Sequence, residues 1–124
     1  MTLNSVEKLH NVLSSLNQNT MPLRLAYKFT KISSKIEEDY NFYIEKTKEI
    51  VIKYAEKDEE GKIIPNEQGN VTIHKNCISQ AEKELFELAA IEVDNPEITF
   101  TLEELESLEI KPYDLQYLIP FIEE

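Results

Sequence analysis

The sequence predicts a mainly α-helical protein with a small β element (α+β): a long helical hairpin with a short β-hairpin at its tip, followed by a short C-terminal strand and short helices. Apolar residues recur at steps of three and four from residue 25 to residue 54, and no glycine or proline interrupts residues 23–60. Both glycines lie in the polar stretch "KDEEGKIIPNEQGNVTIHKN", residues 57–76, and a second helical pattern follows it.

A chain of 124 residues is long enough for one modest core, so we expect a single domain over residues 1–124. Within it, the helical hairpin spans residues 22–92, the β-hairpin tip residues 61–74, and a C-terminal docking segment residues 96–124. No internal repeat or linker divides the chain. One cysteine and no membrane-length apolar run predict a soluble protein of a reducing compartment.

The charge balance is strongly acidic, with 13 basic against 24 acidic residues and a net charge of −11. Such a chain repels phosphate backbones, so we expect no direct binding of nucleic acid. The charge serves solubility, or the acidic face meets a basic partner or imitates nucleic acid. The net charge by itself does not separate these interpretations.

The first helix is predicted to begin after Asn4 or Ser5, since either side chain can cap it. "NQNT", residues 17–20, ends it with turn-forming side chains. Its apolar positions have helical spacing, and they are Val6, Leu9, Val12, Leu13 and Leu16.

The second helix is the most informative segment. Thr20 can cap it, and Pro22 lies near the first turn, where proline is tolerated. A helix of roughly 33 residues, on the order of 50 Å long, is too long to be covered entirely by the rest of so short a chain. A returning segment or a second copy is therefore expected to cover its stripe, which consists of Leu25, Phe29, Ile32, Ile36, Tyr40, Tyr43, Thr47, Ile50 and Tyr54.

The returning segment is "CISQAEKELFELAAIEV", which predicts a helix packed antiparallel against the C-terminal half of the long one. Ile78, Ala81, Leu85 and Leu88 form its apolar face, and Phe86 is expected to widen that face. Between the two helices, "KIIP" and "NVTI" flank the turn-prone "NEQGN" and predict the two-stranded hairpin. An isolated strand pair is marginal in water, so we expect this tip to be mobile or to be stabilised by a partner.

The last third of the chain predicts short elements. "PEITF" is typical of a strand, and Thr101 with Glu104 fits a capping box that starts a helix through "LEELESL". Pro112 is placed at a further helix start, and Pro120 is expected to stop that helix. The high apolar density of this tail predicts that it docks on the core.

No sequence motif indicates catalysis, and we predict no catalytic residue, no cofactor and no metal ligand. The chain lacks a phosphate-binding glycine loop, a nucleophile elbow and a CxxC pair. His74 and Cys77 have half of a zinc-site spacing, but a structural zinc needs four ligands. "DEEGK" begins like a calcium loop, yet Ile63 and Pro65 occupy ligand positions.

Interaction through apolar side chains is the remaining possibility, and six residues are the interface candidates. Tyr27 and Phe42 fall off the apolar stripe and are expected to be exposed, as interface anchors are. The stripe itself and the tip supply the others, which are Ile36, Tyr43, Ile63 and Ile64.

The order of these segments resembles a family of small proteins of unknown function that phages and prophages of low-GC Gram-positive bacteria encode. The resemblance covers the chain from about residue 20 onward and depends on "MPLRLAYKFTKI", "YAEKDEEGK", "QGNVTI", "AEKELFELAAIEV" and the ending "PFIEE". It implies a viral gene context, and it brings no active-site residue to this chain.

We therefore expect a non-enzymatic protein–protein interaction factor, a virion-assembly helper or structural accessory. The alternative is an acidic inhibitor of a host defence or nucleic-acid-processing protein, and a small enzyme or metal protein is the third class. The expected partner is a phage structural or host protein, a second copy of the chain, or both, with no membrane. The expected location is the cytoplasm of the bacterial host, or the virion.

Overall fold

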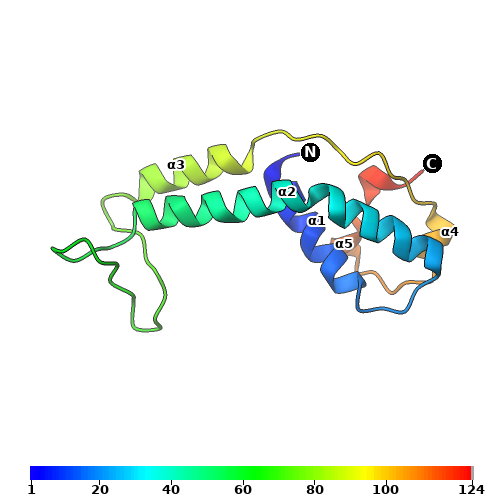
Figure 1. The fold of residues 1–124 in the computed structure, drawn as a ribbon, viewed down its shortest axis with the longest axis horizontal. Coiled ribbons are helices and arrows are strands. Elements are labelled where there is room, and N and C mark those ends of the chain that lie inside the picture. Colours follow the sequence, from blue (N-terminus) through cyan, green and yellow to red (C-terminus); the bar gives the residue numbers. More distant parts are fainter. Residues whose placement is uncertain (124) are drawn as a thin grey trace. The chain divides into compact units, whose positions relative to one another are not determined.

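The computed structural model describes residues 1–123 and is mainly helical, as predicted (Figure 1). In this part of the chain there are helices and isolated bridges but no strand. In chain order the helical elements are α1 (Leu3–Leu16), α2 (Leu23–Lys53), α3 (Ile78–Ala89), α4 (Leu102–Leu105), α5 (Pro112–Leu115) and the 3-10 turn η1 (Ile119–Phe121).

Helix α1 begins earlier than its sequence predicts. The Oγ1 atom of Thr2 accepts a hydrogen bond from the backbone N–H of Ser5 at 3.2 Å, so Thr2 is the cap. The expectation that Asn4 or Ser5 caps this helix is therefore wrong, because the Thr2 side chain already accepts the free N–H of Ser5. The predicted apolar face is confirmed, since all five of its residues are buried.

Helix α2 is 31 residues long and unbroken, as the absence of glycine and proline predicts. The carbonyl of Pro22 accepts the N–H of Ala26 at 3.0 Å, so proline stands where its missing N–H costs nothing.

Contacts between residues in space divide the chain into two compact units. Residues 1–40 and 92–123 form the terminal unit, and residues 41–91 form the middle unit. The expectation of a single domain stays a prediction.

The terminal unit contains the core. Helix α1, the first part of α2 and the C-terminal segment all contribute to it, and the rings of Phe29 and Phe100 lie 5.0 Å apart. Each large apolar side chain buried there stabilises the fold by about 2 kcal/mol. The buried cluster consists of Val6, Leu9, Val12, Leu13, Leu16, Leu25, Phe29, Ile32, Ile36, Phe100, Leu105, Leu108, Leu118 and Phe121.

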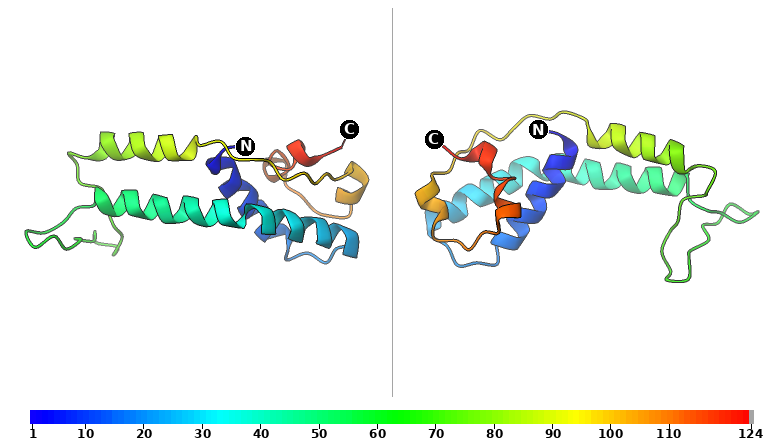
Figure 2. Two further views of the ribbon diagram at one scale, coloured as in Figure 1. Left: turned by 45° about the horizontal axis from the view of Figure 1, so that its top comes forward. Right: turned by 180° about the vertical axis from the view of Figure 1, so that it is seen from behind.

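In the middle unit, α3 runs back beside the last turns of α2 in both sets of views (Figures 1 and 2). An ion pair of 3.0 Å joins Lys53 near the end of α2 to Glu84 of α3. Only Ala55, Ala81 and Leu88 are buried in this unit. Phe86 is 75 % exposed, so the expectation that it widens the packed face of α3 is wrong. At about 100° per residue, it lies about 140° around the helix from Ala81.

The tip between α2 and α3 contains a short repeat that the sequence analysis missed. In "DEEGK", residues 58–62, the Oδ1 atom of Asp58 accepts the N–H groups of Glu60 and Lys62, both at 2.9 Å. In "NEQGN", residues 66–70, Asn66 holds its own turn with the same pair of bonds. Around these turns the structure has only isolated antiparallel bridges, which are Ala55↔Ile73, Lys57↔Ile63 and Pro65↔Val71. The two-stranded hairpin of residues 61–74 stays a prediction.

The C-terminal segment contributes to the core but differs in detail from its prediction. "PEITF" forms no strand, and Phe100 makes a single parallel bridge to Ile122. The capping box of Thr101 and Glu104 is confirmed at the start of α4, and Pro112 begins α5. Pro120 lies inside η1 rather than ending a helix, because proline fits an early position of a helical turn.

Candidate interaction surfaces

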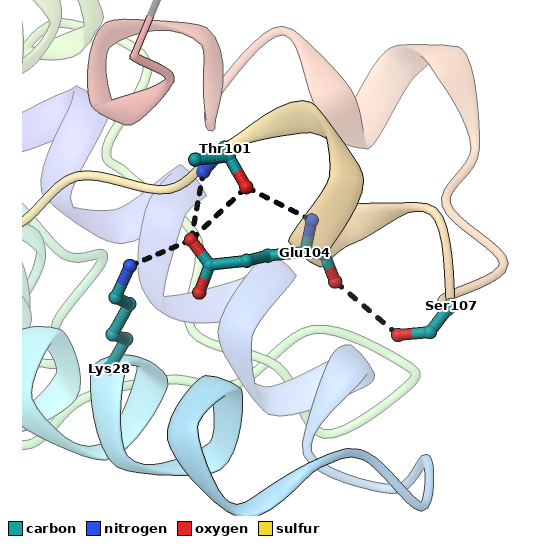
Figure 3. Close-up of polar contacts among 4 residues, drawn as sticks. All are labelled: Lys28, Thr101, Glu104 and Ser107. Carbon is teal, nitrogen blue, oxygen red and sulfur yellow. Dashed lines mark hydrogen bonds and ion pairs between the residues drawn. The ribbon is translucent and has the colours of Figure 1, made fainter.

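The best-connected polar side chain of the terminal unit is Glu104, at the start of α4 (Figure 3). Its Oε1 atom accepts hydrogen bonds from the backbone N–H of Thr101 at 3.0 Å and from the Nζ atom of Lys28 on α2 at 2.8 Å. The N–H of Glu104 in turn donates to Thr101 Oγ1 at 3.2 Å. These bonds attach the chain around residue 101 to the first part of α2.

The ion pair also sets the charge state of Glu104. The hydrogen bond from Lys28, with that from the Thr101 backbone, lowers the pKa of the Glu104 carboxyl below its ordinary value. Glu104 therefore stays ionised when the solution is mildly acidic. Lys28 Nζ also lies 5.7 Å from the centre of the Phe100 ring, so the pair rests on the edge of the core.

An open groove runs along the first part of α2 beside residues 97–99, with a volume of about 730 Å³. Leu23 and Tyr27 line it and are 86 % and 63 % exposed. The Glu104 contacts attach residue 101 to α2, close in sequence to residues 97–99, which form the wall of the groove. We call this feature the basic groove, and its lining residues are Leu23, Arg24, Tyr27, Lys28, Lys31, Lys35, Glu97, Ile98 and Thr99.

The basic groove carries a charge opposite to that of the chain. Its four cationic side chains, at positions 24, 28, 31 and 35, follow one face of α2 at steps of four, three and four. Residues 8–36 contain five basic residues and no acidic one, whereas 23 of the 24 acidic residues lie in residues 37–124. The net charge of −11 therefore conceals a positive segment.

The middle unit buries few apolar side chains. It buries three and exposes seven large ones, whereas the terminal unit buries 15 and exposes five. On α2, Ile52 is 49 % exposed and lies about 160° around the helix from Ile50 and Tyr54. Ile78, which was expected on the packed face of α3, is 45 % exposed. We call the four exposed apolar residues on the two helices of the middle unit the outward residues, which are Phe42, Ile52, Ile78 and Phe86.

No helix within residues 1–123 has the length and apolar character needed to cross a membrane. No group of three or more His, Cys, Asp and Glu side chains in the same residues could hold a metal ion.

Comparison with protein-family models, curated proteins and solved structures finds no match to this chain. Its function is therefore inferred from geometry and charge.

The six interface candidates fall into three groups in the structure. Tyr27 and Phe42 are exposed, as their positions off the stripe predict, and Ile64 is 44 % exposed at the tip. Tyr43 and Ile63 are half-buried. Ile36 is only 2 % exposed in the terminal-unit core, so it is not accessible as an interface residue.

Two further features escaped the sequence analysis. The positive segment was detectable, because the absence of acidic residues from positions 8–36 can be read from the sequence. The exposure of Phe86 was harder to predict from the sequence, since its position relative to Leu85 and Leu88 fits a wide apolar face as well as an outward one. Burial decides between the two, and burial depends on how much of the chain covers α3.

Proposed function

We propose that this protein is a non-enzymatic protein–protein interaction factor that works in a phage programme, as a virion-assembly helper or structural accessory. The phage context comes from the family resemblance of the sequence. The interaction role is supported by the middle unit, which exposes more large apolar side chains than it buries.

The physical reason lies in the stability of short helices. A helix of 12 residues, such as α3, is marginal in water unless tertiary packing covers its apolar face. Single exposed apolar residues are ordinary on protein surfaces. Here the outward residues coincide with the unit of fewest buried side chains, so covering them with a partner adds the burial that this unit lacks.

The tip belongs to the same proposal. Residues 61–74 form a two-stranded hairpin when the partner is bound, and Ile63 and Ile64 lie at the contact. The Pro65↔Val71 bridge and the Asn66 turn between its two residues support this, because they already set the register of the pair. A strand pair of this size needs a partner to be stable.

The test compares Phe86→Gln and Ile52→Gln with the matched variants Lys83→Gln and Lys48→Gln on the same helices. Light scattering at several concentrations measures self-association, and an affinity pull-down from infected host lysate with mass spectrometry identifies other partners. We expect the first two variants to lose the assembly or the partner while their helix content is unchanged. If Phe86→Gln and Ile52→Gln retain both self-association and partner binding in full, the proposal is contradicted.

An acidic inhibitor of a host defence or nucleic-acid-processing protein is the second candidate. The excess of acidic residues in positions 37–124, 23 against eight basic ones, favours it, since a basic site on the target would meet mainly negative charge. The affinity of an inhibitor for its target then falls steeply as salt rises. An assembly factor bound through its outward residues loses little affinity under the same change.

A further inference from the structure

We propose that the basic groove of the terminal unit is a second docking site, which binds an extended peptide segment of a partner protein that carries carboxylates beside apolar side chains. This site is separate from the outward residues of the middle unit, so either proposal can fail while the other holds.

The charges of the groove support an acidic occupant. Lys28 is already paired with Glu104 at 2.8 Å. Arg24, Lys31 and Lys35 make no ion pair with any residue of 1–123, and they share one face of α2. Like charges at this spacing repel one another, and an approaching carboxylate relieves that repulsion. Among the lining residues Glu97 supplies one negative charge, which does not neutralise three cations.

The apolar lining restricts the occupant further. Leu23 and Tyr27 stand exposed beside the cations, and Lys31 Nζ lies 5.8 Å from the centre of the Tyr27 ring. A small inorganic anion would use the charges and leave these surfaces in water. A peptide with alternating acidic and apolar residues uses both, and burial of its apolar side chains adds affinity that salt does not screen.

A nucleic acid fits the molecule less well. A strand longer than the groove would continue past it, and the residues outside the groove lining carry 23 acidic and nine basic side chains. Those charges repel phosphates wherever the strand leaves the groove. A short peptide presents its carboxylates only to the groove and avoids that repulsion.

The backbone beside α2 indicates an extended conformation of the peptide. Phe100 directs its N–H to the carbonyl of Phe121 and its carbonyl to the N–H of Glu123. In an extended chain the backbone groups of neighbouring residues point in opposite directions, so those of Thr99 face away from this bridge. Within residues 1–123 the backbone groups of Glu97 and Thr99 make no hydrogen bond, and both residues line the groove. They are therefore available for strand addition.

The experiment uses the full chain and a fluorescein-labelled peptide that alternates Glu and Leu, with binding followed by fluorescence anisotropy. Two comparison peptides replace Glu by Gln or Leu by Ser, and a labelled single-stranded oligonucleotide tests the phosphate alternative. The groove variant is Lys31→Glu with Lys35→Glu. Its matched control is Lys48→Glu with Lys75→Glu, which makes the same change of charge at exposed lysines of the middle unit.

We expect the Glu/Leu peptide to bind at low salt and both comparison peptides to bind at least about tenfold more weakly. The groove variant should lose about tenfold or more in affinity, while the control variant and Phe86→Gln stay within about twofold of the wild type. Bound peptide should also slow hydrogen exchange at the amides of Glu97 and Thr99. If the double reversal disturbs the circular dichroism spectrum, Lys31→Gln with Lys35→Gln replaces it.

Three outcomes overturn the proposal. The first is no measurable binding of the Glu/Leu peptide. The second is an equal loss of affinity in the groove and control variants, which would assign binding to net charge. The third is tighter binding of the oligonucleotide than of the peptide, which would assign the groove to nucleic acid.

Discussion

Ile36 lies in the terminal-unit core with 2 % of its surface exposed, one turn before α2 reaches the end of that unit. Ile36→Asp places an unpaired carboxylate among apolar side chains, and we expect it to destabilise the fold by about 3 kcal/mol or more. Urea unfolding of the wild type and the variant measures the difference. Ser34→Asp makes the same addition at an exposed position of the same helix and should change stability by no more than about 0.5 kcal/mol. Equal midpoints for Ile36→Asp and the wild type would contradict the prediction.

The charge of Glu104 is tied to the fold by its contacts with Lys28 and Thr101. Its pKa is lowered by Lys28 and by the Thr101 backbone, so the folded state favours the ionised carboxyl. The stabilisation is fully present above the unfolded pKa of about 4.3, and it is lost as the pH falls through the lower folded pKa. We expect Glu104→Gln to be less stable than the wild type by about 1 kcal/mol at neutral pH.

The pH dependence distinguishes this role from simple packing. The difference between Glu104→Gln and the wild type should narrow below about pH 4, because the wild-type carboxyl becomes protonated. Glu103→Gln, one residue earlier and exposed, serves as the control and should show no such change. A difference that is constant from neutral to acidic pH would show that the ion pair does not contribute through its charge.

At the scale of elements, the two turns of the tip depend on their glycines. Gly61 and Gly69 have φ angles of +83° and +80°, a conformation that side chains disfavour, although a Cβ atom at either position would meet open space. We expect Gly69→Ala to destabilise its turn by about 1 kcal/mol through backbone strain alone. Hydrogen exchange at the Asn66 and Asn70 amides should accelerate about fivefold. Gly69→Asn should have a smaller effect, since asparagine tolerates this conformation. An unchanged rate in Gly69→Ala would contradict the role of strain.

The helices were predictable from the sequence because their signals are local. The uninterrupted stripe of α2, the capping box of Thr101 and the first-turn position of Pro112 each depend on a few neighbouring residues. The predicted strand at "PEITF" failed because a strand requires a neighbour along its length, and Phe100 meets only Ile122. The inward position of Phe86 failed for a related reason, since burial depends on segments distant in the sequence. The groove combines both kinds of information, with a local stripe of cations and a distant wall at residues 97–99.

At the scale of the whole molecule, the distribution of charge matters more than its sum. A net charge of −11 argues against contact with anions. This sum combines residues 8–36, which contain five basic residues and no acidic one, with an acidic remainder of the chain. Electrostatic interaction at physiological salt acts over about 8 Å, so a ligand in the groove meets its local cations first. We therefore expect the argument from net charge to exclude long polyanions but not a short acidic peptide.

The uneven distribution of buried side chains leads to the last prediction. The terminal unit buries 15 large or small apolar side chains and the middle unit three, so local opening should need less free energy in α3 than in α1. We expect the amides of α3, in a dilute solution of monomer, to exchange at least about tenfold faster than those of α1, although the helices have similar lengths of 12 and 14 residues. Hydrogen exchange read by mass spectrometry measures both helices in one experiment.

The same measurement then separates an intrinsic property of α3 from one that a partner supplies. If the outward residues are a binding surface, then self-association or added partner should slow exchange in α3 and leave α1 unchanged, because burial of Ile78 and Phe86 raises the free energy of opening only where it occurs. Phe86→Gln should remove this protection, and Lys83→Gln should retain it. Slow exchange of α3 in the dilute monomer would mean that the three buried side chains are sufficient for the middle unit. The argument that this unit needs a partner would then fail.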